Sequence, residues 1–356
     1  MDDENAAPNA DDRTRSKRPR WKTVLFAAAT ICGVLLLGAG ATEIGLRIFL
    51  YEEEANGGYW AAGAFEADPA AGFCHAAGFH GRAYRKQAFD CPVEIQANHL
   101  RQKNYAEQMK YERRVLILGD SFTFGLGVNE EDAFPSLLQP MLNSRGIGVI
   151  NGGQTAFCTD QEVAFGKRLA GEVKPDAILL CVFPENDVIG NYYKNHRSND
   201  VINGYRLPGD RVLPLAPIDF LRTHSYLWMF VEHHYRSRTR ESRLADYNRL
   251  AVENPAALMQ PTFDNLLELR DFCRAEKIRL GVVLIPSVRK DPFMQPLKHV
   301  LRQLRVPMLD LTRAGFGAQH RFAADDHWNE RGHAEVTRHL APFCLEVLES
   351  AADETR

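Results

Sequence analysis

The chain has 356 residues, which is enough for one large domain or two ordinary ones. Hydrophobic residues make up 45% of it and charged residues 25%, as in ordinary globular proteins. The formal net charge of -3 excludes non-specific binding to nucleic acid, because there is no basic excess to neutralise phosphates.

The N-terminal 42 residues have the pattern of a membrane anchor. Residues 1–22 are polar, acidic at first and then basic, and we expect a disordered cytoplasmic tail there. Residues 23–42 contain no charged side chain and are long enough to span a hydrocarbon core of ~30 Å as a helix. Since six basic residues precede this segment, the positive-inside rule predicts a single-pass helix with everything after about residue 43 periplasmic or extracellular.

Two other interpretations of residues 23–42 remain open at this point. One is a cleavable signal peptide, because "AGA" at 39–41 resembles a cleavage site, although the apolar part of such a peptide is usually only ~7–15 residues. The other is a buried core helix. We favour the uncleaved anchor.

The seven cysteines form no CxxC pair, so a structural zinc site is not expected. In an oxidising compartment, Cys74 and Cys91 are candidates to pair, since they flank a loop-rich stretch. A metal cluster of these two with His75 and His80 fits no compact zinc spacing. The other cysteines after residue 42 are expected to be buried thiols, namely Cys158, Cys181, Cys273 and Cys344.

Residues 43–112 form a lead-in segment with few periodic stretches and a small hairpin expected near 92–100. From Arg114 onward, short apolar runs alternate with segments of helical spacing. Strands are predicted at 114–120, 147–151, 175–184, 278–286 and 306–311. Helices are predicted at 131–146, 159–173, 261–277, 291–305 and 329–350. For the helix at 159, Thr159 and Glu162 are expected to form a capping box.

This alternation over residues 113–350 predicts a three-layer α/β/α sandwich with a five-stranded, mostly parallel, flavodoxin-like sheet. A long insertion at about 190–260 interrupts it. The insertion begins with a polar, Gly- and Pro-containing loop and continues with a helical part at 218–240. Insertions of this length usually lie at the functional rim of a fold or carry partner contacts.

Polar segments follow four of the predicted strands. They are Asp120–Ser121, "NGGQTAFCTD" at 151–160, "PENDV" at 184–188 and "AADDHWNERGH" at 323–333. Ligands of an open parallel sheet gather at the carboxyl ends of its strands. Each segment alone is typical of a cap or a turn, but their common position and their order predict one site.

These segments resemble the conserved blocks of the SGNH hydrolases, a branch of the GDSL-type esterases and acyltransferases. "GDSFTFGLG" resembles the first block, "PENDV" the third and "DDHWNERGH" the last. The lead-in "DPAAGFCHAAGFHG…IQANHLR" resembles that of membrane-anchored bacterial members, so the resemblance covers roughly residues 65–345. It implies that Ser121 is the nucleophile, His327 the general base and Asn186 an oxyanion-hole donor.

An aspartate must hold the imidazole in one tautomer, and Asp325 and Asp326 both compete for this role. The resemblance favours Asp325, since related anchored members carry an Asp-x-His-Trp arrangement. His333 and Asp120 are interpreted as structural.

The chain departs from the family pattern at two positions. Ala156 occupies the place of a glycine whose N–H faces the oxyanion, and Glu185 directly precedes Asn186, where a small residue is common. An alanine still has a backbone N–H, so the expected oxyanion hole consists of the Ser121 and Ala156 N–H groups and the Asn186 amide.

The sequence therefore predicts an anchored, exported serine esterase or deacylase that cleaves an ester-linked acyl group, on a cell-envelope polysaccharide or lipid. An O-acyltransferase that modifies such a polysaccharide uses the same residues and is the alternative. A catalytically silent binding module is a third reading. No metal, nucleotide cofactor or nucleic-acid partner is expected, because the Gly-rich "GDSFTFGLG" matches neither a Walker loop nor GxGxxG.

Overall fold

The computed structural model describes residues 20–194, 199–208, 211, 213–288 and 291–350. The chain divides into two compact units, of which the first ends at Leu50 and the second begins at Tyr51. Helix α1 (Arg20–Phe49) makes up the described part of the first unit, and its apolar side chains are exposed. It is long and apolar enough to cross a membrane, and it extends beyond residues 23–42 at both ends. Residues 1–19 of the expected tail lie outside the described residues.

The second unit is built on a five-stranded sheet. Its strands are β5 (Arg113–Leu118), β6 (Ile147–Asn151), β7 (Ala177–Val182), β10 (Arg279–Leu284) and β11 (Met308–Asp310). They lie in the order β11-β10-β7-β5-β6, and every neighbouring pair is parallel. In chain order this is 2-1-3-4-5, the flavodoxin-like arrangement, so the predicted sheet is confirmed.

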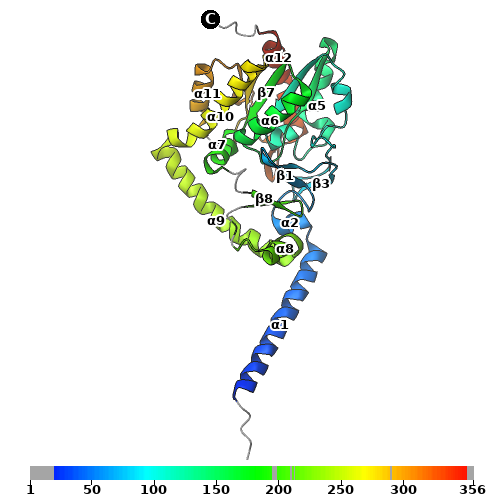
Figure 1. The fold of residues 1–356 in the computed structure, drawn as a ribbon, viewed down its shortest axis with the longest axis vertical. Coiled ribbons are helices and arrows are strands. Elements are labelled where there is room, and N and C mark those ends of the chain that lie inside the picture. Colours follow the sequence, from blue (N-terminus) through cyan, green and yellow to red (C-terminus); the bar gives the residue numbers. More distant parts are fainter. Residues whose placement is uncertain (1–19, 195–198, 209–210, 212, 289–290, 351–356) are drawn as a thin grey trace, which may run out of the picture. The chain divides into compact units, whose positions relative to one another are not determined.

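Both faces of the sheet are covered by helices (Figure 1). Successive residues of a strand point to opposite faces, so Leu116 packs into one core and Ile117 into the other. The first core also receives side chains from α6 (Thr159–Val173), α10 (Pro255–Ala275) and α11 (Met294–Gln303). The second receives them from α5 (Phe134–Leu142) and α12 (Glu330–Glu349). The predicted three-layer architecture is confirmed.

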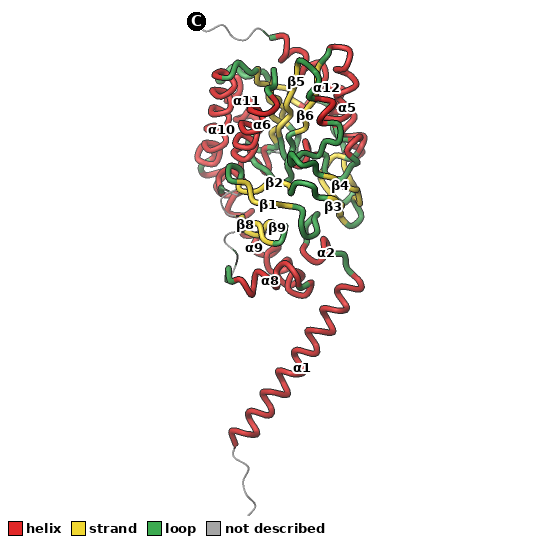
Figure 2. The backbone as a smooth tube through the Cα atoms, turned by 45° about the vertical axis from the view of Figure 1, so that its right-hand side comes forward, coloured by secondary structure: helices red, strands yellow, loops and turns green. Residues whose placement is uncertain are grey.

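The lead-in segment contains two β-hairpins (Figure 2). One pairs β1 (Phe65–Asp68) with β2 (Gly72–His75), and the other pairs β3 (His80–Arg85) with β4 (Phe89–Glu94). The hairpin expected near 92–100 therefore closes earlier, at 86–88, where Gln87 has a φ of 62°. Two short helices, α2 (Glu52–Asn56) and α3 (Tyr105–Gln108), flank the hairpins. Lead-in side chains such as Trp60 and Phe73 belong to the same buried cluster as the sheet.

The insertion contains more regular structure than the sequence predicts. After α7 (Pro184–Tyr193) it forms a hairpin of β8 (Asn199–Ile202) and β9 (Tyr205–Pro208), then α8 (Ala216–His224) and α9 (Tyr226–Glu253). The predicted helical part is thus two helices, separated at Ser225, whose hydroxyl accepts the Trp228 N–H at the start of α9. A small buried cluster of Ala55, Tyr205, Leu207 and Met229 joins the insertion to the lead-in segment.

The predicted capping box at the start of α6 is wrong. Cys158 is the N-cap residue, Thr159 is already helical, and the Cys158 side chain accepts no N–H of the first turn, whereas the Asn191 side chain accepts that of Asp160 at 3.1 Å. Glu162 does not reach back to the helix start, because its side chain is buried in the interior.

All seven cysteines are free thiols in the structure. Cys74 and Cys91 are buried in different hairpins and are not paired. The four expected to be buried thiols, Cys158, Cys181, Cys273 and Cys344, are buried.

Candidate active site

Ser121 lies immediately beyond the carboxyl end of the central strand β5. It is the first residue of the short helix α4 (Ser121–Phe124), for which Asp120 is the N-cap and accepts the Phe122 N–H at 2.9 Å. The turn requires glycine at position 119, since a Cβ atom there would lie 2.1 Å from the Thr123 hydroxyl oxygen. Strand, turn and cap together place the Ser121 hydroxyl at the edge of the sheet.

His327 and Asp325 reach the same edge from a small hairpin of β12 (Arg321–Phe322) and β13 (Asp325–Trp328). The Ser121 Oγ is 2.7 Å from the His327 Nε2, and the His327 Nδ1 is 2.5 Å from the Asp325 Oδ1. A proton on Nδ1 donates to the carboxylate, so Nε2 accepts from the serine hydroxyl. The structure thus brings three sequence-predicted residues into one hydrogen-bonded chain.

Of the two candidate aspartates, Asp325 is the one that contacts His327. Its Oδ1 also accepts the His327 backbone N–H at 3.0 Å, and its side chain is only 5% exposed. Asp326 is exposed, and its backbone carbonyl accepts from Arg321. Adjacent residues of β13 point in opposite directions, which accounts for the difference.

Tyr59, a lead-in residue that the sequence did not single out, also contacts Asp325. Its hydroxyl donates to the Asp325 Oδ2 at 2.9 Å, and its ring meets the His327 ring edge-on at 5.8 Å. Burial acts to raise the pKa of Asp325, but the hydrogen bonds from His327 and Tyr59 outweigh it and hold that pKa below its ordinary value. The Arg85 Nε, 4.0 Å from Oδ2, adds positive charge nearby.

The three donors predicted for the oxyanion hole are the Ser121 and Ala156 N–H groups and the Asn186 amide. Asn186, in the first turn of α7, donates from Nδ2 to the Asp120 Oδ2 at 2.7 Å and, through a long contact of 3.5 Å, to the Phe157 carbonyl. Within the described part of the chain, the Ser121 and Ala156 N–H groups donate no hydrogen bond. Ala156 has a φ of 63°, the left-handed conformation that a glycine adopts without strain.

Glu185, the other departure from the family pattern, is engaged elsewhere. Its carboxylate accepts a hydrogen bond from the Ser287 hydroxyl, beyond the end of β10. This contact gives the charge a partner away from the Asn186 amide.

The loop that carries Ala156 is held between the sheet and the lead-in segment. The Gln154 N–H donates to the Gly119 carbonyl at 3.0 Å, and its side-chain oxygen accepts the His75 N–H at 2.9 Å. His75 contacts the Thr155 hydroxyl through Nε2 at 2.9 Å. His75 is fully buried, and burial lowers its pKa to about 3, so it is neutral.

A pair of buried carboxyl groups, Glu162 and Asp187, lies behind this loop. The Asp187 Oδ2 accepts the Phe183 N–H at 2.7 Å, whereas neither Glu162 oxygen has a hydrogen-bond partner among the described residues. Burial, reinforced by the charge of Asp187, raises the pKa of Glu162 well above its ordinary value. Burial likewise raises the pKa of Asp187.

His333 and Asp120 occupy the places expected of structural residues. The His333 Nδ1 accepts the Phe134 N–H at 3.2 Å, and burial lowers the pKa of His333 to about 3. Asp120 is fully buried and joins α4 to Asn186 through its two oxygens.

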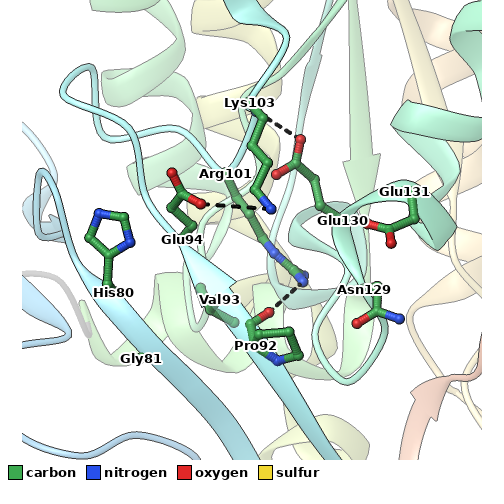
Figure 3. Close-up of a pocket in the computed structure, with 10 residues that line it drawn as sticks. All are labelled: His80, Gly81, Pro92, Val93, Glu94, Arg101, Lys103, Asn129, Glu130 and Glu131. Carbon is green, nitrogen blue, oxygen red and sulfur yellow. Dashed lines mark hydrogen bonds and ion pairs between the residues drawn. The ribbon is translucent and has the colours of Figure 1, made fainter.

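A cavity of about 230 Å³ lies next to the hairpin of β3 and β4 (Figure 3). None of the sequence-predicted site residues lines it, and Lys103 pairs there with Glu94 at 3.6 Å. Arg101, in its wall, is buried and donates to the carbonyls of Gly125 and Val128 at 2.6 and 2.7 Å. It therefore holds the loop that follows Ser121 and α4.

No family model and no curated protein sequence matches the chain. Several solved structures are similar to it. TesA is 15% identical over 66% of this chain and 99% of its own, with a TM-score of 0.40. The psychrotrophic esterase EstA from Pseudoalteromonas sp. is 14% identical over 67% of this chain and 100% of its own (TM-score 0.37). Axe2, an acetylxylan esterase from Geobacillus stearothermophilus, is 14% identical over 69% of this chain and 98% of its own (TM-score 0.37).

The sheet order and the position of the sequence blocks agree with the expectation from the sequence. The first block follows β5, the segment at 151–160 follows β6, the third block follows β7, and the last block begins on β13. Hydrogen bonds of Ser121 with His327 and of Asp120 with Asn186 join three of them at one edge of the sheet. The five-stranded parallel sheet and the position of these blocks at its edge are the arrangement that the resemblance to the SGNH hydrolases implies.

Proposed function

We propose that the protein is a serine esterase that cleaves an ester-linked acyl group, with Ser121 as nucleophile, His327 as general base and Asp325 as the carboxylate that orients it. The observation that carries this proposal is the continuous chain from the Ser121 Oγ to the His327 Nε2 at 2.7 Å and from Nδ1 to Asp325 at 2.5 Å. A serine hydroxyl is a weak nucleophile unless a base of this kind accepts its proton.

In the first half of the reaction, the Ser121 Oγ attacks the ester carbonyl carbon while its proton moves to the His327 Nε2. The carbonyl π electrons move to the oxygen, which becomes an oxyanion. The proposed donors to that oxyanion are the Ser121 and Ala156 N–H groups, which donate no other hydrogen bond within the described residues, and the Asn186 amide, which would exchange its long 3.5 Å contact with the Phe157 carbonyl for the oxyanion. The tetrahedral intermediate then collapses, the ester C–O bond breaks, and His327 returns the proton to the leaving alcohol.

In the second half, a water molecule attacks the acyl-Ser121 carbonyl and gives a proton to His327. The bond to Ser121 breaks, the carboxylic acid leaves, and the proton returns to the Ser121 Oγ. Asp325 stays ionised throughout and stabilises the imidazolium that forms twice in the cycle.

We also propose that α1 anchors the enzyme in a membrane, with the N-terminus cytoplasmic and the domain after residue 50 exported to the periplasm or cell exterior. The apolar length of α1 and the basic residues that precede it support this orientation. An anchor there would hold the site beside acylated glycans and lipids of the cell envelope, the substrate class we propose. Mass spectrometry of the mature protein checks the anchor: we expect residues 23–42 to be retained, and a new N-terminus after Ala41 would contradict it.

The activity is tested by Ser121→Ala with p-nitrophenyl acetate as substrate. We expect kcat/KM to fall at least about 10³-fold, because the nucleophile is lost. Ser136→Ala, a half-buried serine in α5, is the matched control and should turn over the ester as the wild type does. Unchanged turnover by Ser121→Ala would refute the assignment of the nucleophile.

A further inference from the structure

Three side chains of the lead-in segment converge away from the Ser121 site. They come from opposite strands of one hairpin, Glu66 in β1 and Cys74 in β2, and from His99 in the turn after β4. The His99 Nδ1 lies 3.4 Å from the Glu66 Oε1 and 3.7 Å from the Cys74 Sγ. All three ligand atoms lie within 4.8 Å of one another.

We propose that Glu66, Cys74 and His99 bind a zinc ion. Carboxylate oxygen, thiolate sulfur and imidazole nitrogen are the ligands that zinc takes in proteins, at ~2.0–2.3 Å and in tetrahedral geometry. Those bond lengths place neighbouring ligand atoms about 3.4 Å apart for N and O and about 3.6 Å apart for N and S. The separations in the chain, 3.4 and 3.7 Å, agree with both values.

The backbone positions the ligands. Glu66 and Cys74 are directly opposed in the register of the hairpin, so their side chains leave the same face. His99 has a φ of 67°, a conformation that is strained for a non-glycine residue and is held here by hydrogen bonds of both its backbone groups. Its carbonyl accepts the Gln154 side-chain amide at 2.9 Å, and its N–H donates to the Gln96 carbonyl at 3.0 Å.

The arrangement does not suit nucleophilic catalysis. A thiol–imidazole–carboxylate triad needs the two partners on different ring nitrogens, whereas Cys74 and Glu66 both face the Nδ1 of His99. Burial also raises the pKa of the Cys74 thiol to about 12, so the free thiol is not a nucleophile at neutral pH.

Metal binding changes the protonation of two ligands. The Cys74 S–H proton is released to solvent as the sulfur–zinc bond forms. The His99 Nδ1, which is 3.2 Å from the His75 carbonyl, gives up its hydrogen bond, and the ring proton resides on Nε2 instead. The Glu66 Oε2 keeps its bond from the Ala77 N–H at 3.1 Å, which orients the carboxylate. The Glu66 side chain is 43% exposed and gives the ion a route from solvent, with water as fourth ligand.

The proposed site is connected to the loop of Ala156. Gln154 bonds to the N–H of His75, the neighbour of Cys74, and to the carbonyl of His99. A zinc ion that fixes Cys74 to His99 would fix both partners of Gln154. Because only the folded chain assembles the three ligands, zinc is expected to raise the melting temperature.

The test uses the full-length protein in detergent, stripped with a chelator and then titrated with Zn²⁺ in competition with a chromophoric chelator. A parallel titration with Co²⁺ monitors the thiolate-to-cobalt charge-transfer absorption. Cys74→Ser and His99→Asn remove one ligand each, and asparagine tolerates the left-handed conformation of position 99. Cys91→Ser is the matched control, since Cys91 is a buried free thiol in the neighbouring hairpin.

We expect one zinc ion per wild-type chain, a rise in melting temperature with zinc, and a thiolate–cobalt band. Cys74→Ser and His99→Asn should weaken zinc binding at least about 100-fold and Cys74→Ser should abolish the band, while Cys91→Ser changes neither. Absence of a bound ion in the folded wild type, or binding unchanged in both ligand variants, would overturn the proposal. If Cys74→Ser does not fold, as its melting curve will show, His99→Asn decides. The readout is metal binding and is independent of ester turnover.

Discussion

The carboxyl edge of the sheet and the lead-in segment contribute to the site in different ways. The edge carries the groups that we propose act directly on the ester, each placed directly after a strand or on a short hairpin: Ser121, Asn186 and His327. The lead-in segment carries groups that hold them, with Tyr59 on Asp325 and Arg101 on the loop after Ser121. The resemblance assigns roles to the first set, but it assigns none to Arg101, which lies in the lead-in motif, and Tyr59 lies outside the quoted motifs.

The difference teaches that the motif residues are not a complete site. Asp325 owes its lowered pKa partly to Tyr59, which lies 266 positions earlier in the chain. The Ala156 loop likewise depends on His75 through Gln154. The comparison is therefore testable: changes at the edge should abolish activity, and changes in the lead-in segment should reduce it.

The largest effect is expected from Asp325→Asn. Loss of the carboxylate removes the group that fixes the His327 tautomer, so kcat should fall about 10²- to 10⁴-fold. Asp326→Asn is the matched control, because Asp326 is exposed and its side chain has no contact with His327 among the described hydrogen bonds. Equal losses in the two variants, measured by ester turnover, would contradict the assignment.

Tyr59→Phe should have an intermediate effect. A hydrogen bond to a charged group contributes about 1.5 kcal/mol or more, so we expect kcat to fall about tenfold while KM stays unchanged. Tyr84 is another half-buried lead-in tyrosine, and among the described residues it makes no hydrogen bond to Asp325, so Tyr84→Phe should keep full activity. If Tyr59→Phe kept the wild-type kcat, the lead-in tyrosine would make no contribution to catalysis.

Glu162→Gln should stabilise the protein without affecting turnover. The folded-state pKa of Glu162 is raised, so its contribution to stability is present at low pH and is lost as the pH rises. The gain in free energy of unfolding should thus be larger at pH 7 than at pH 5 by chemical denaturation. Glu172→Gln, exposed on the same helix, is the control, and a gain that does not depend on pH would count against a raised pKa at position 162.

The smallest effect is expected from Ala156→Gly. Glycine keeps the N–H and adopts the φ of 63° without strain, while its greater freedom in the unfolded chain costs about the same amount. Turnover should stay within about threefold of the wild type and stability within about 1 kcal/mol. A loss of activity above tenfold would mean that the methyl group, not the N–H, matters at this position.

The same two regions differ in how well their site residues could be predicted from the sequence. Strand ends of a parallel sheet meet at one edge, so Ser121, Asn186 and His327 were predicted to converge from their order alone. The choice between Asp325 and Asp326 depends on which of the two side chains points toward His327. The order of the strands does not determine this, and the resemblance favoured Asp325. Tyr59 and the trio of Glu66, Cys74 and His99 depend on hairpin register and on a left-handed turn, and irregular segments have no periodicity that reveals these. The prediction of a capping box was wrong because Glu162 lies on the face of α6 that packs toward the interior.

The central claim is that Ser121 is an activated nucleophile, and a fluorophosphonate probe with peptide mass spectrometry tests it most directly. We predict a covalent adduct on Ser121 in the full-length protein, no adduct in Ser121→Ala and at least about tenfold slower labelling in His327→Ala. The same result would rule out a silent binding module. A folded wild-type protein that stays unlabelled at Ser121, or that is labelled equally fast without His327, would contradict the account.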